Sequence, residues 1–424
     1  MKTSVLQLAA FGGSPQYEVP IHVGQPSIPP REQLLAAMEQ VLNSGILTNN
    51  GPQVRAFEQA IIRATGARHC VACCNATTAL QIAARAMNLT GEVIMPSLTF
   101  VATAHAMEWI GLTPVFADVL PESQTMDPES AAACITSKTS ALIPVHLWGH
   151  TCDVPQLTEL ARENNLRLLF DSSHAFGCRR NGIPVGNFGD AEVFSFHATK
   201  FVNSFEGGAI VTNNDQLAER CRRLRAFGIT DLTEVSDIGI NGKMHEISAA
   251  AGLVSLDLLP KLLETNERNR EIYRTELADI GGITVLPIPE TTESNLQYFV
   301  TMIHEEVLGL SRDQVVNLLR AEGIFARSYF VPGCHRSAPY VSNGASCHQR
   351  TSLPVTESIL QEIMQLPTGM AIQPEDACTI GRMLRFIAEN SGEISRLLRM
   401  RSGRIPRHPA DPSRPRETPL REAG

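Results

Sequence analysis

The chain has 424 residues and a formal net charge of −8, with 43% hydrophobic and 19% charged residues. These values are ordinary for a soluble globular protein and predict one large and one smaller domain. The negative charge argues against nucleic acid as a partner. No stretch approaches the about 20 uninterrupted apolar residues of a membrane-spanning helix, so no membrane contact is expected. The N-terminus lacks a convincing signal peptide, which predicts a cytoplasmic protein.

The first half of the chain alternates short apolar runs with amphipathic segments. Helices are predicted over about residues 30–43 and 54–65, after a loose extension over residues 1–20. From residue 69 to Asp171, strands of four to seven apolar residues alternate with helices, which indicates an α/β domain with a mostly parallel sheet. Ligands bind such sheets at the carboxyl ends of the strands. Four candidates lie at or just past predicted strand ends: residues 75–78, Phe100, Asp171 and Ser195.

A long helical stretch over residues 245–277, interrupted near Pro260, leads into a second domain. Strands are predicted there over residues 283–287, 297–304 and 325–330, and helices over residues 311–322, 356–364 and 374–389. After Ser391 the chain becomes rich in arginine and proline, a composition that cannot bury enough surface to order itself. The predicted organisation is an extension (1–20), a large domain (21–260), a small α+β domain (261–390) and a disordered tail (391–424).

Residues 191–213 hold Lys200 between two apolar runs that are predicted to be strands. The chain has only five lysines against thirty-one arginines. Lysine can form a Schiff base once its amine is deprotonated and arginine cannot, so a lysine kept here suggests amine chemistry. An isolated lysine would ordinarily be interpreted as part of a solvated hairpin, so the assignment depends on its partners.

The partners that the sequence offers match the needs of pyridoxal 5′-phosphate. This cofactor needs a lysine for its aldehyde, a carboxylate for its pyridine nitrogen, donors for its phosphate and a flat surface for its ring. Asp171 ends a predicted strand 29 residues before Lys200. Residues 75–78 form a helix-opening turn of the kind that binds phosphate, and Phe100 lies near the same edge of the sheet.

Other cofactors and metals are not indicated. There is no GxGxxG motif after the first strand and no GxxxxGK[ST], HExxH or GxSxG motif, so a dinucleotide or a P-loop nucleotide is not favoured. The CxxC formed by Cys70 and Cys73 has no second pair, and the other cysteines lack metal-ligand spacing. No metal is expected, and the cysteines are predicted to be reduced thiols.

Together these motifs resemble the DegT/StrS family of sugar aminotransferases, which have the aspartate-aminotransferase type of fold (fold type I). The resemblance covers about residues 21–389. Its most specific part is SFHATK followed by FEGG, in which Phe205 stands where a glycine is common. The blocks FDSSHAFG, PSLTFVATA and GINGKMHEISAAAGL also match, as does NATTAL, in which Ala76 replaces a glycine.

The resemblance implies a role for each matched residue. Lys200 would carry the cofactor and move the proton, Asp171 would pair with the pyridine nitrogen, and His174 would contact the ring oxygen. Phe100 would stack on the cofactor ring. The phosphate ligands would be Ala76, Thr77, Ser195 and, from the neighbouring subunit, Asn241. Lys243, Tyr329 and His335 are weaker candidates for substrate contacts.

Each of these residues also has an ordinary structural interpretation. Asp171 would serve as a helix cap, His174 and Phe100 as core residues, and Ser195 as a turn cap. Their occurrence together, in order and at the right strand ends, favours the shared functional interpretation. The turn of Glu206, Gly207 and Gly208 has only close backbone packing behind the lysine as its expected reason.

The resembled subgroup implies transfer of an amino group from L-glutamate to C-4 of dTDP-4-keto-6-deoxy-D-glucose. The product would be dTDP-4-amino-4,6-dideoxy-D-glucose, for deoxysugar biosynthesis. Amination at C-3 of a ketosugar, or of a cyclitol ketone, is the alternative within the family, and a non-catalytic scaffold with the same fold is the alternative outside it. Because Asn241 would serve the neighbouring site, a homodimer with shared active sites is expected.

Overall fold

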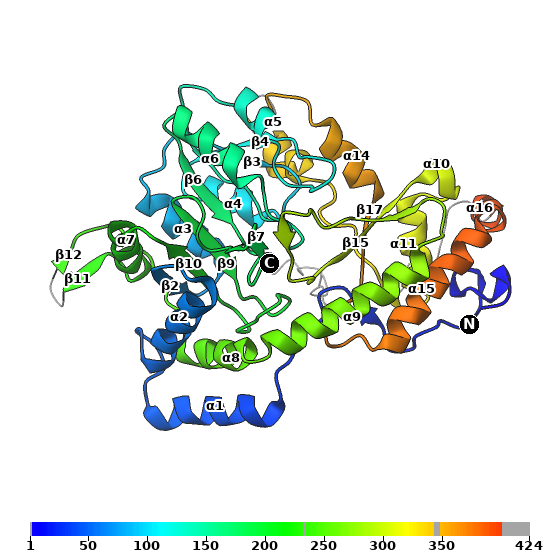
Figure 1. Ribbon diagram of the computed structural model, residues 1–424, viewed down its shortest axis with the longest axis horizontal. Helices are drawn as coiled ribbons and strands as arrows, with labels where there is room; N and C mark the ends of the chain where they lie inside the picture. Colours follow the sequence, from blue (N-terminus) through cyan, green and yellow to red (C-terminus); the bar gives the residue numbers. More distant parts are fainter. Residues whose placement is uncertain (1, 232–233, 343–347, 401–424) are drawn as a thin grey trace, which may run out of the picture.

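The computed structural model describes residues 2–231, 234–342 and 348–400. It consists of a large α/β lobe and a smaller lobe, and helix α9 (Leu259–Leu277) runs from one to the other (Figure 1). α9 follows α8 (Glu246–Leu256) after a two-residue break, with Pro260 in its first turn, where a proline is tolerated. The predicted interruption of this helical stretch is confirmed.

The large domain is built on a seven-stranded sheet of order β2-β10-β9-β6-β5-β3-β4. The pairings β3–β4, β3–β5, β5–β6 and β6–β9 are parallel, whereas β10 runs antiparallel to both β2 and β9. The mostly parallel sheet is therefore confirmed. Its strands are β2 (His69–Cys73), β3 (Glu92–Pro96), β4 (Thr113–Ala117), β5 (Thr139–Leu142), β6 (Arg167–Asp171), β9 (Ala191–Ser195) and β10 (Gly208–Thr212).

Helices cover both faces of this sheet, which is why its central strands are apolar at nearly every position. Successive residues of β2 show the two faces: Val71 packs in the cluster that includes α3, α4 and α7, and Ala72 packs in the cluster that includes α2 and α8. α1 lies outside α8 (Figure 1). The helices are α1 (Arg31–Ser44), α2 (Pro52–Thr65), α3 (Ala76–Ala86), α4 (Ala102–Glu108), α5 (Pro128–Ala133), α6 (Val154–Glu163) and α7 (Asp215–Arg225).

The small domain has an antiparallel sheet of order β13-β15-β17. Its elements are β13 (Ile283–Val285), β15 (Phe299–Ile303), α10 (Glu305–Leu308), α11 (Arg312–Ala321), β16 (Ile324–Phe325), α14 (Pro354–Glu362), β17 (Ile363–Leu366) and α15 (Pro374–Glu389). The short helix α12 (Ala338–Ser342) lies between β16 and α14 in the chain, but its Tyr340 packs in the core of the large domain. Strand β17 begins where α14 ends, and the sequence prediction had merged its first residues into the helix. The strand predicted over residues 325–330 is only the end of the two-residue β16.

Short elements complete the fold. β1 (Ile21–His22) pairs in parallel with β16, and β14 (Thr292–Glu293) joins β7 (Arg179–Arg180) and β8 (Ile183–Pro184) in a small sheet. A hairpin of β11 (Ile229–Asp231) and β12 (Glu234–Val235) projects from the large domain (Figure 1). A 3-10 turn, η3, spans Cys334–Arg336.

The N-terminal extension was predicted to be loose, and this was wrong. Two 3-10 turns, η1 (Val5–Gln7) and η2 (Ala9–Phe11), place Leu8 and Phe11 in the core of the small domain. The buried carboxylate of Glu322 accepts hydrogen bonds from the backbone amides of Ala9 at 2.7 Å and Gln16 at 2.9 Å. The segment is therefore held in place by four buried apolar residues and by the Glu322 carboxylate, although its local sequence favours neither helix nor strand. The four residues are Val5, Leu8, Ala10 and Phe11.

The predicted tail also begins too early. Residues Ser391–Met400 form helix α16, which packs against the small domain through the buried side chains of Ile394 and Leu398. The rest of the predicted tail, residues 401–424, lies outside the described residues. Within the described part of the chain, no helix combines the length and the apolar character needed to cross a bilayer.

Candidate active site

A cavity of about 460 Å³ opens at the carboxyl ends of the sheet strands. Eight of the eleven residues predicted from the sequence line it: Ala76, Thr77, Phe100, Asp171, His174, Ser195, Lys200 and Tyr329. They come from four separate strand ends and from the small domain. The topology of the sheet therefore brings together side chains that are up to 253 residues apart in the chain.

Lys200 lies in the connection between β9 and β10, and its backbone amide donates to the carbonyl of His197 at 2.8 Å. Burial lowers the pKa of its amine to about 8, against the opposing effect of the negative charge of Asp171. An amine with this pKa is neutral in a large fraction of molecules near pH 8. Lys200 can therefore act as a nucleophile and as a base.

Asp171 is the last residue of β6 and is 5% exposed. Its Oδ2 accepts a hydrogen bond from Thr103 Oγ1 at 2.7 Å, and its Oδ1 accepts one from the backbone amide of Ser173 at 3.1 Å. Thr103 is in turn 3.0 Å from the hydroxyl of Thr99. These donors fix the orientation of a carboxylate that faces the cavity.

His174 is buried among aromatic rings, with centroids 4.5 Å from Tyr298 and 5.6 Å from Trp148. Burial, followed by the positive charge of Lys200, holds its pKa well below the usual value, so the ring is neutral. Its Nδ1 accepts from the backbone amide of Trp148 at 3.5 Å. The proton of the neutral ring therefore belongs on Nε2, which makes His174 a hydrogen-bond donor.

The first turn of α3 forms an anion-binding wall of the cavity. Asn75 caps this helix by accepting from the amide of Thr78 at 2.8 Å, while Ala76 and Thr77 occupy the first two helical positions. The amides at a helix N-terminus lack partners within the helix and carry partial positive charge. With Ser195 at the neighbouring strand end, this turn suits a phosphate group.

The Glu-Gly-Gly turn of residues 206–208 explains how the start of α3 lies so close to the connection that carries Lys200. A Cβ on Gly208 would stand 2.5 Å from the carbonyl carbon of Asn75 and 2.6 Å from the amide nitrogen of Ala76. A Cβ on Gly207 would meet the hydroxyl of Ser204 and the methyl group of Met244. Neither position has room for a side chain, which confirms the expected close packing behind the lysine.

Phe100 provides the flat surface. It is 55% exposed although it lies in the cavity wall, and its ring centroid is 5.8 Å from that of Phe330. An exposed ring beside a half-buried lysine and a fixed carboxylate is the arrangement that a planar cofactor needs. The amine, the carboxylate, the donor-rich turn and the aromatic face together fit pyridoxal 5′-phosphate.

Comparison with known proteins decides the family. The model of the DegT/DnrJ/EryC1/StrS aminotransferase family matches residues 30–385. The chain belongs to this family. It is therefore a sugar aminotransferase, with pyridoxal 5′-phosphate as its cofactor. The resemblance inferred from the motifs and the expected fold class are both confirmed.

Three relatives are similar over most of their length. The dTDP-4-amino-4,6-dideoxy-D-glucose transaminase of Shigella dysenteriae is 37% identical over 81% of this chain and 93% of its own. The protein of the same name from Escherichia coli is 35% identical over 86% of this chain and 98% of its own. The crystal structure of DesI in the presence of its TDP-sugar product is 45% identical, with a TM-score of 0.89, and covers 93% of this chain and 100% of that one.

Three predicted residues of the aminotransferase do not line the cavity of their own chain. Asn241 is exposed and forms an isolated bridge with Ala226. Lys243 donates to Asn49 Oδ1 at 2.7 Å, and its amine lies 5.3 Å from the ring centroid of Phe227.

His335 is the third of these residues, and the structure does not support a substrate contact for it. It is 7% exposed, and its Nδ1 lies 2.6 Å from Ser97 Oγ and its Nε2 2.8 Å from Glu357 Oε1. Both ring nitrogens are thus engaged in holding η3 against the end of β3 and the start of α14. Its position beside other family-like residues in the sequence misled the prediction.

Sequence reasoning missed Thr103, Tyr298 and Phe330, which also line the cavity. Thr103 is in the first turn of α4, and Thr99 lies in the loop before that helix, so no helical spacing in the sequence marked the pair. The two aromatic residues come from the small domain, where no local pattern marks them as site residues. Among the described residues, no group of three histidine, cysteine or acidic side chains is placed to hold a metal ion.

Proposed function

We propose that the protein transfers an amino group from L-glutamate to C-4 of dTDP-4-keto-6-deoxy-D-glucose, giving dTDP-4-amino-4,6-dideoxy-D-glucose for deoxysugar biosynthesis. The observation that carries this proposal is the Lys200 amine, which lies in the cavity with a depressed pKa beside the fixed carboxylate of Asp171. The names of the two bacterial relatives and the TDP-sugar product of DesI support the choice of sugar and carbon.

Each residue then has a distinct task. Bound pyridoxal 5′-phosphate supplies an electrophilic carbon and a ring that accepts the electron pair of a broken C–H bond. Lys200, as a neutral amine, would take the proton from the α-carbon of the amino donor, and the ammonium group formed in this way would later give the proton back. Asp171 keeps the ring nitrogen protonated, because a buried carboxylate favours the cationic form of its partner.

The remaining residues bind and orient. The first-turn amides of α3, with the hydroxyl groups of Thr77 and Ser195, hold the phosphate. The Nε2 proton of His174 is available to the ring oxygen, and Phe100 covers one face of the ring. Tyr329 lines the cavity from the small domain and would contact the sugar nucleotide.

A homodimer that shares its active sites completes this proposal. Asn241 and Lys243 lie outside the cavity of their own chain, and Lys243 contacts Asn49 in the loop after α1. Leu42 of α1 is 61% exposed, and Ile238, in the segment before Asn241, is 88% exposed. A dimer interface would cover such apolar side chains. Asn241 of the partner subunit would then reach the phosphate.

We also propose a cytoplasmic location. All cysteines among the described residues are free, and most are buried. Burial raises the pKa of Cys70 and Cys178 above the usual range, which keeps these side chains as thiols. Unpaired thiols in this number are typical of a reducing compartment.

The test is chemical. The purified protein with pyridoxal 5′-phosphate should show an absorbance band near the visible edge, and Lys200→Ala should lose it. Glutamate and a panel of dTDP- and GDP-linked 3-keto and 4-keto sugars should then yield the C-4 amine, identified by mass spectrometry and NMR. Turnover of 3-keto sugars alone would overturn the C-4 assignment. A protein that binds no cofactor would instead be a scaffold.

A further inference from the structure

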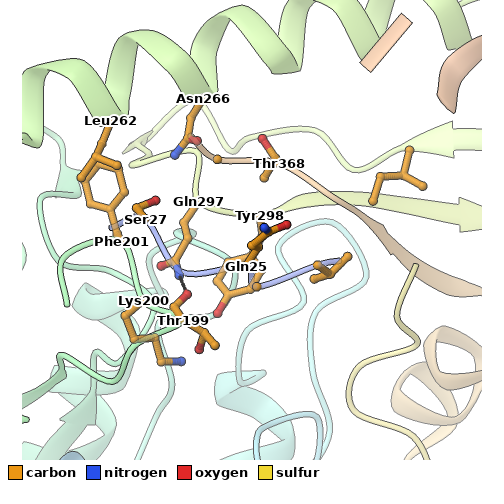
Figure 2. Close-up of a pocket in the computed structure, with 14 residues that line it drawn as sticks. Gln25, Ser27, Thr199, Lys200, Phe201, Leu262, Asn266, Gln297, Tyr298 and Thr368 are labelled. Carbon is orange, nitrogen blue, oxygen red and sulfur yellow. Dashed lines mark hydrogen bonds between the residues drawn. The ribbon is translucent and has the colours of Figure 1, made fainter. Parts of the chain in front are cut away.

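A small pocket, called the chamber below, lies beside the connection that carries Lys200, and Figure 2 shows the side chains that line it. Its volume is about 30 Å³, room for about one water molecule. Thr199 and Lys200 line both this chamber and the active-site cavity. These two residues therefore lie between two spaces, a position they share with Tyr298.

Hydrogen bonds to other segments hold the backbone of the Lys200 connection in position. Gln297 Nε2 donates to the carbonyl of Thr199 at 2.9 Å, and Figure 2 shows its side chain extending across the chamber to that atom. On the far side of Lys200, Asn203 Nδ2 donates to the carbonyl of Ser27 at 2.8 Å, and its amide donates to Ser255 Oγ at 3.1 Å. Gln297 is the anchor on the residue next to Lys200.

The Lys200 amine itself has no such anchor. Its Nζ has no hydrogen bond or ion pair with any side chain in the described part of the chain. The negative charge of Asp171 acts on it only at longer range, by raising the pKa of the amine. The position of the amine is thus decided by the backbone that carries it. A shift of the Thr199 carbonyl would move the amine relative to the cofactor.

The segment that holds Gln297 also contacts the opposite side of the cofactor site. Asn295, which is fully buried, donates through Nδ2 to the carbonyls of His174 and Phe176, both at 3.0 Å. Its own carbonyl accepts from Asn266 of α9 at 3.3 Å. Tyr298 packs its ring on His174 with a centroid distance of 4.5 Å. Residues 295–298 therefore connect the His174 turn, the Lys200 connection and α9.

We infer that residues 295–298 set the distance between the lysine and the cofactor ring, and that Gln297 is a positioning residue for Lys200. Its amide fixes the Thr199 carbonyl, while Asn295 fixes the turn that holds His174. This inference rests on the proposed role of Lys200 as the residue that bonds to the cofactor aldehyde. It assigns a role in positioning Lys200 to Gln297, which lies in a segment leading into the small domain and does not line the active-site cavity.

The experiment measures bond formation with Lys200 separately from cofactor binding. Pyridoxal 5′-phosphate bonds to the lysine, whereas pyridoxamine 5′-phosphate has no aldehyde and uses only the other contacts of the site. Gln297→Met keeps the length of the side chain and removes the donor. Stopped-flow absorbance should show bond formation slowed roughly three- to tenfold, the range that loss of one hydrogen bond corresponds to. The dissociation constant of pyridoxamine 5′-phosphate should not change.

Two further variants keep the result interpretable. Gln25→Met alters another glutamine of the same chamber wall that makes no hydrogen bond to the Lys200 connection, and it should leave both measurements at wild-type values. Gln297→Glu keeps size and polarity but presents an acceptor to the Thr199 carbonyl, so it should slow bond formation at least as much as Gln297→Met. Gln297→Glu also provides a second test of the inference if Gln297→Met does not fold.

The outcomes separate the inference from the proposed function. If the wild-type protein forms no bond with pyridoxal 5′-phosphate, the proposed function fails. If it does and both Gln297 variants react at the wild-type rate, only the positioning role fails. Equal weakening of both cofactor forms would also overturn the inference, because it would show general damage to the site.

Discussion

The depressed pKa of Lys200 predicts its chemical reactivity in the cofactor-free protein. Its pKa is about 8, whereas an exposed lysine has a pKa of about 10.4. At pH 8 roughly half of Lys200 is neutral. Lys138 and Lys261 are exposed and serve as the comparison. An amine-acylating reagent at pH 8 should therefore label Lys200 first, as measured by peptide mass spectrometry. Equal labelling of the three lysines would contradict this pKa.

The same shift predicts how stability depends on pH. The folded-state pKa of Lys200 lies below the unfolded value, so the unfolded chain binds more protons between about pH 8 and about pH 10.4. The contribution of this residue to stability therefore rises with pH through that window and is most unfavourable below pH 8. Lys200→Met should stabilise the cofactor-free protein at pH 7, by urea unfolding, and the gain should shrink towards pH 10. The control Lys261→Met removes an exposed lysine and measures the effect of the substitution itself.

The sequence predicted most of the site because four motifs end strands of one sheet, and such ends converge in space. Asp171 and Lys200 needed only this rule and the chemistry of their side chains. Gln297 and Tyr298 could not be found in this way, because they lie in an irregular segment that precedes β15. Their role depends on where the small domain docks, a long-range contact that no local pattern encodes.

Among the elements, the N-terminal segment shows how tertiary contacts override a weak local signal. Residues 1–20 have no strong helical or strand period, yet Leu8 is fully buried in the small-domain core. The amides of Ala9 and Gln16 bind the buried Glu322 carboxylate. The sequence prediction of β17 failed for a related reason, since a short, mostly apolar run (IMQL) directly after an amphipathic helix fits either state.

The buried position of Leu8 predicts a large effect of truncation in a segment that the sequence suggests is dispensable. Leu8→Ala should lower the free energy of unfolding by about 2–5 kcal/mol, the range for a buried leucine in a packed core. Leu6→Ala is the matched control, because Leu6 is 65% exposed two residues away and should change stability by less than about 0.5 kcal/mol. Urea unfolding measures both. Similar effects would mean that the segment is not packed as described.

At the scale of the whole molecule, the active-site cavity is assembled from both domains. Tyr298, Tyr329 and Phe330 enter it from the small-domain side, whereas Lys200 and Asp171 belong to the large domain. The helix α9 runs along both lobes and is tied to residues 295–298 through Asn266 (Figure 1). The relative position of the domains therefore decides the shape of the substrate site.

The proposed dimer extends this assembly to a second chain, and hybrid dimers can test it. Lys200→Ala removes the lysine, and Asn241→Asp places a negative charge where the partner's phosphate would bind. Each variant alone should be nearly inactive. In a hybrid of the two, one site combines an intact Lys200 with an intact Asn241 of the partner subunit, while the other site has neither.

Random exchange of the two variants should therefore restore about a quarter of wild-type activity, because half of the dimers are hybrids and each hybrid has one complete site. Coupled assays on the mixture would measure this, with native mass spectrometry to confirm that hybrids form. The control mixes Lys200→Ala with a chain that carries both changes, where no site is complete and no activity should return. Hybrids that form without recovery would show that Asn241 does not act across the interface, and full activity of Asn241→Asp alone would remove this residue from the site.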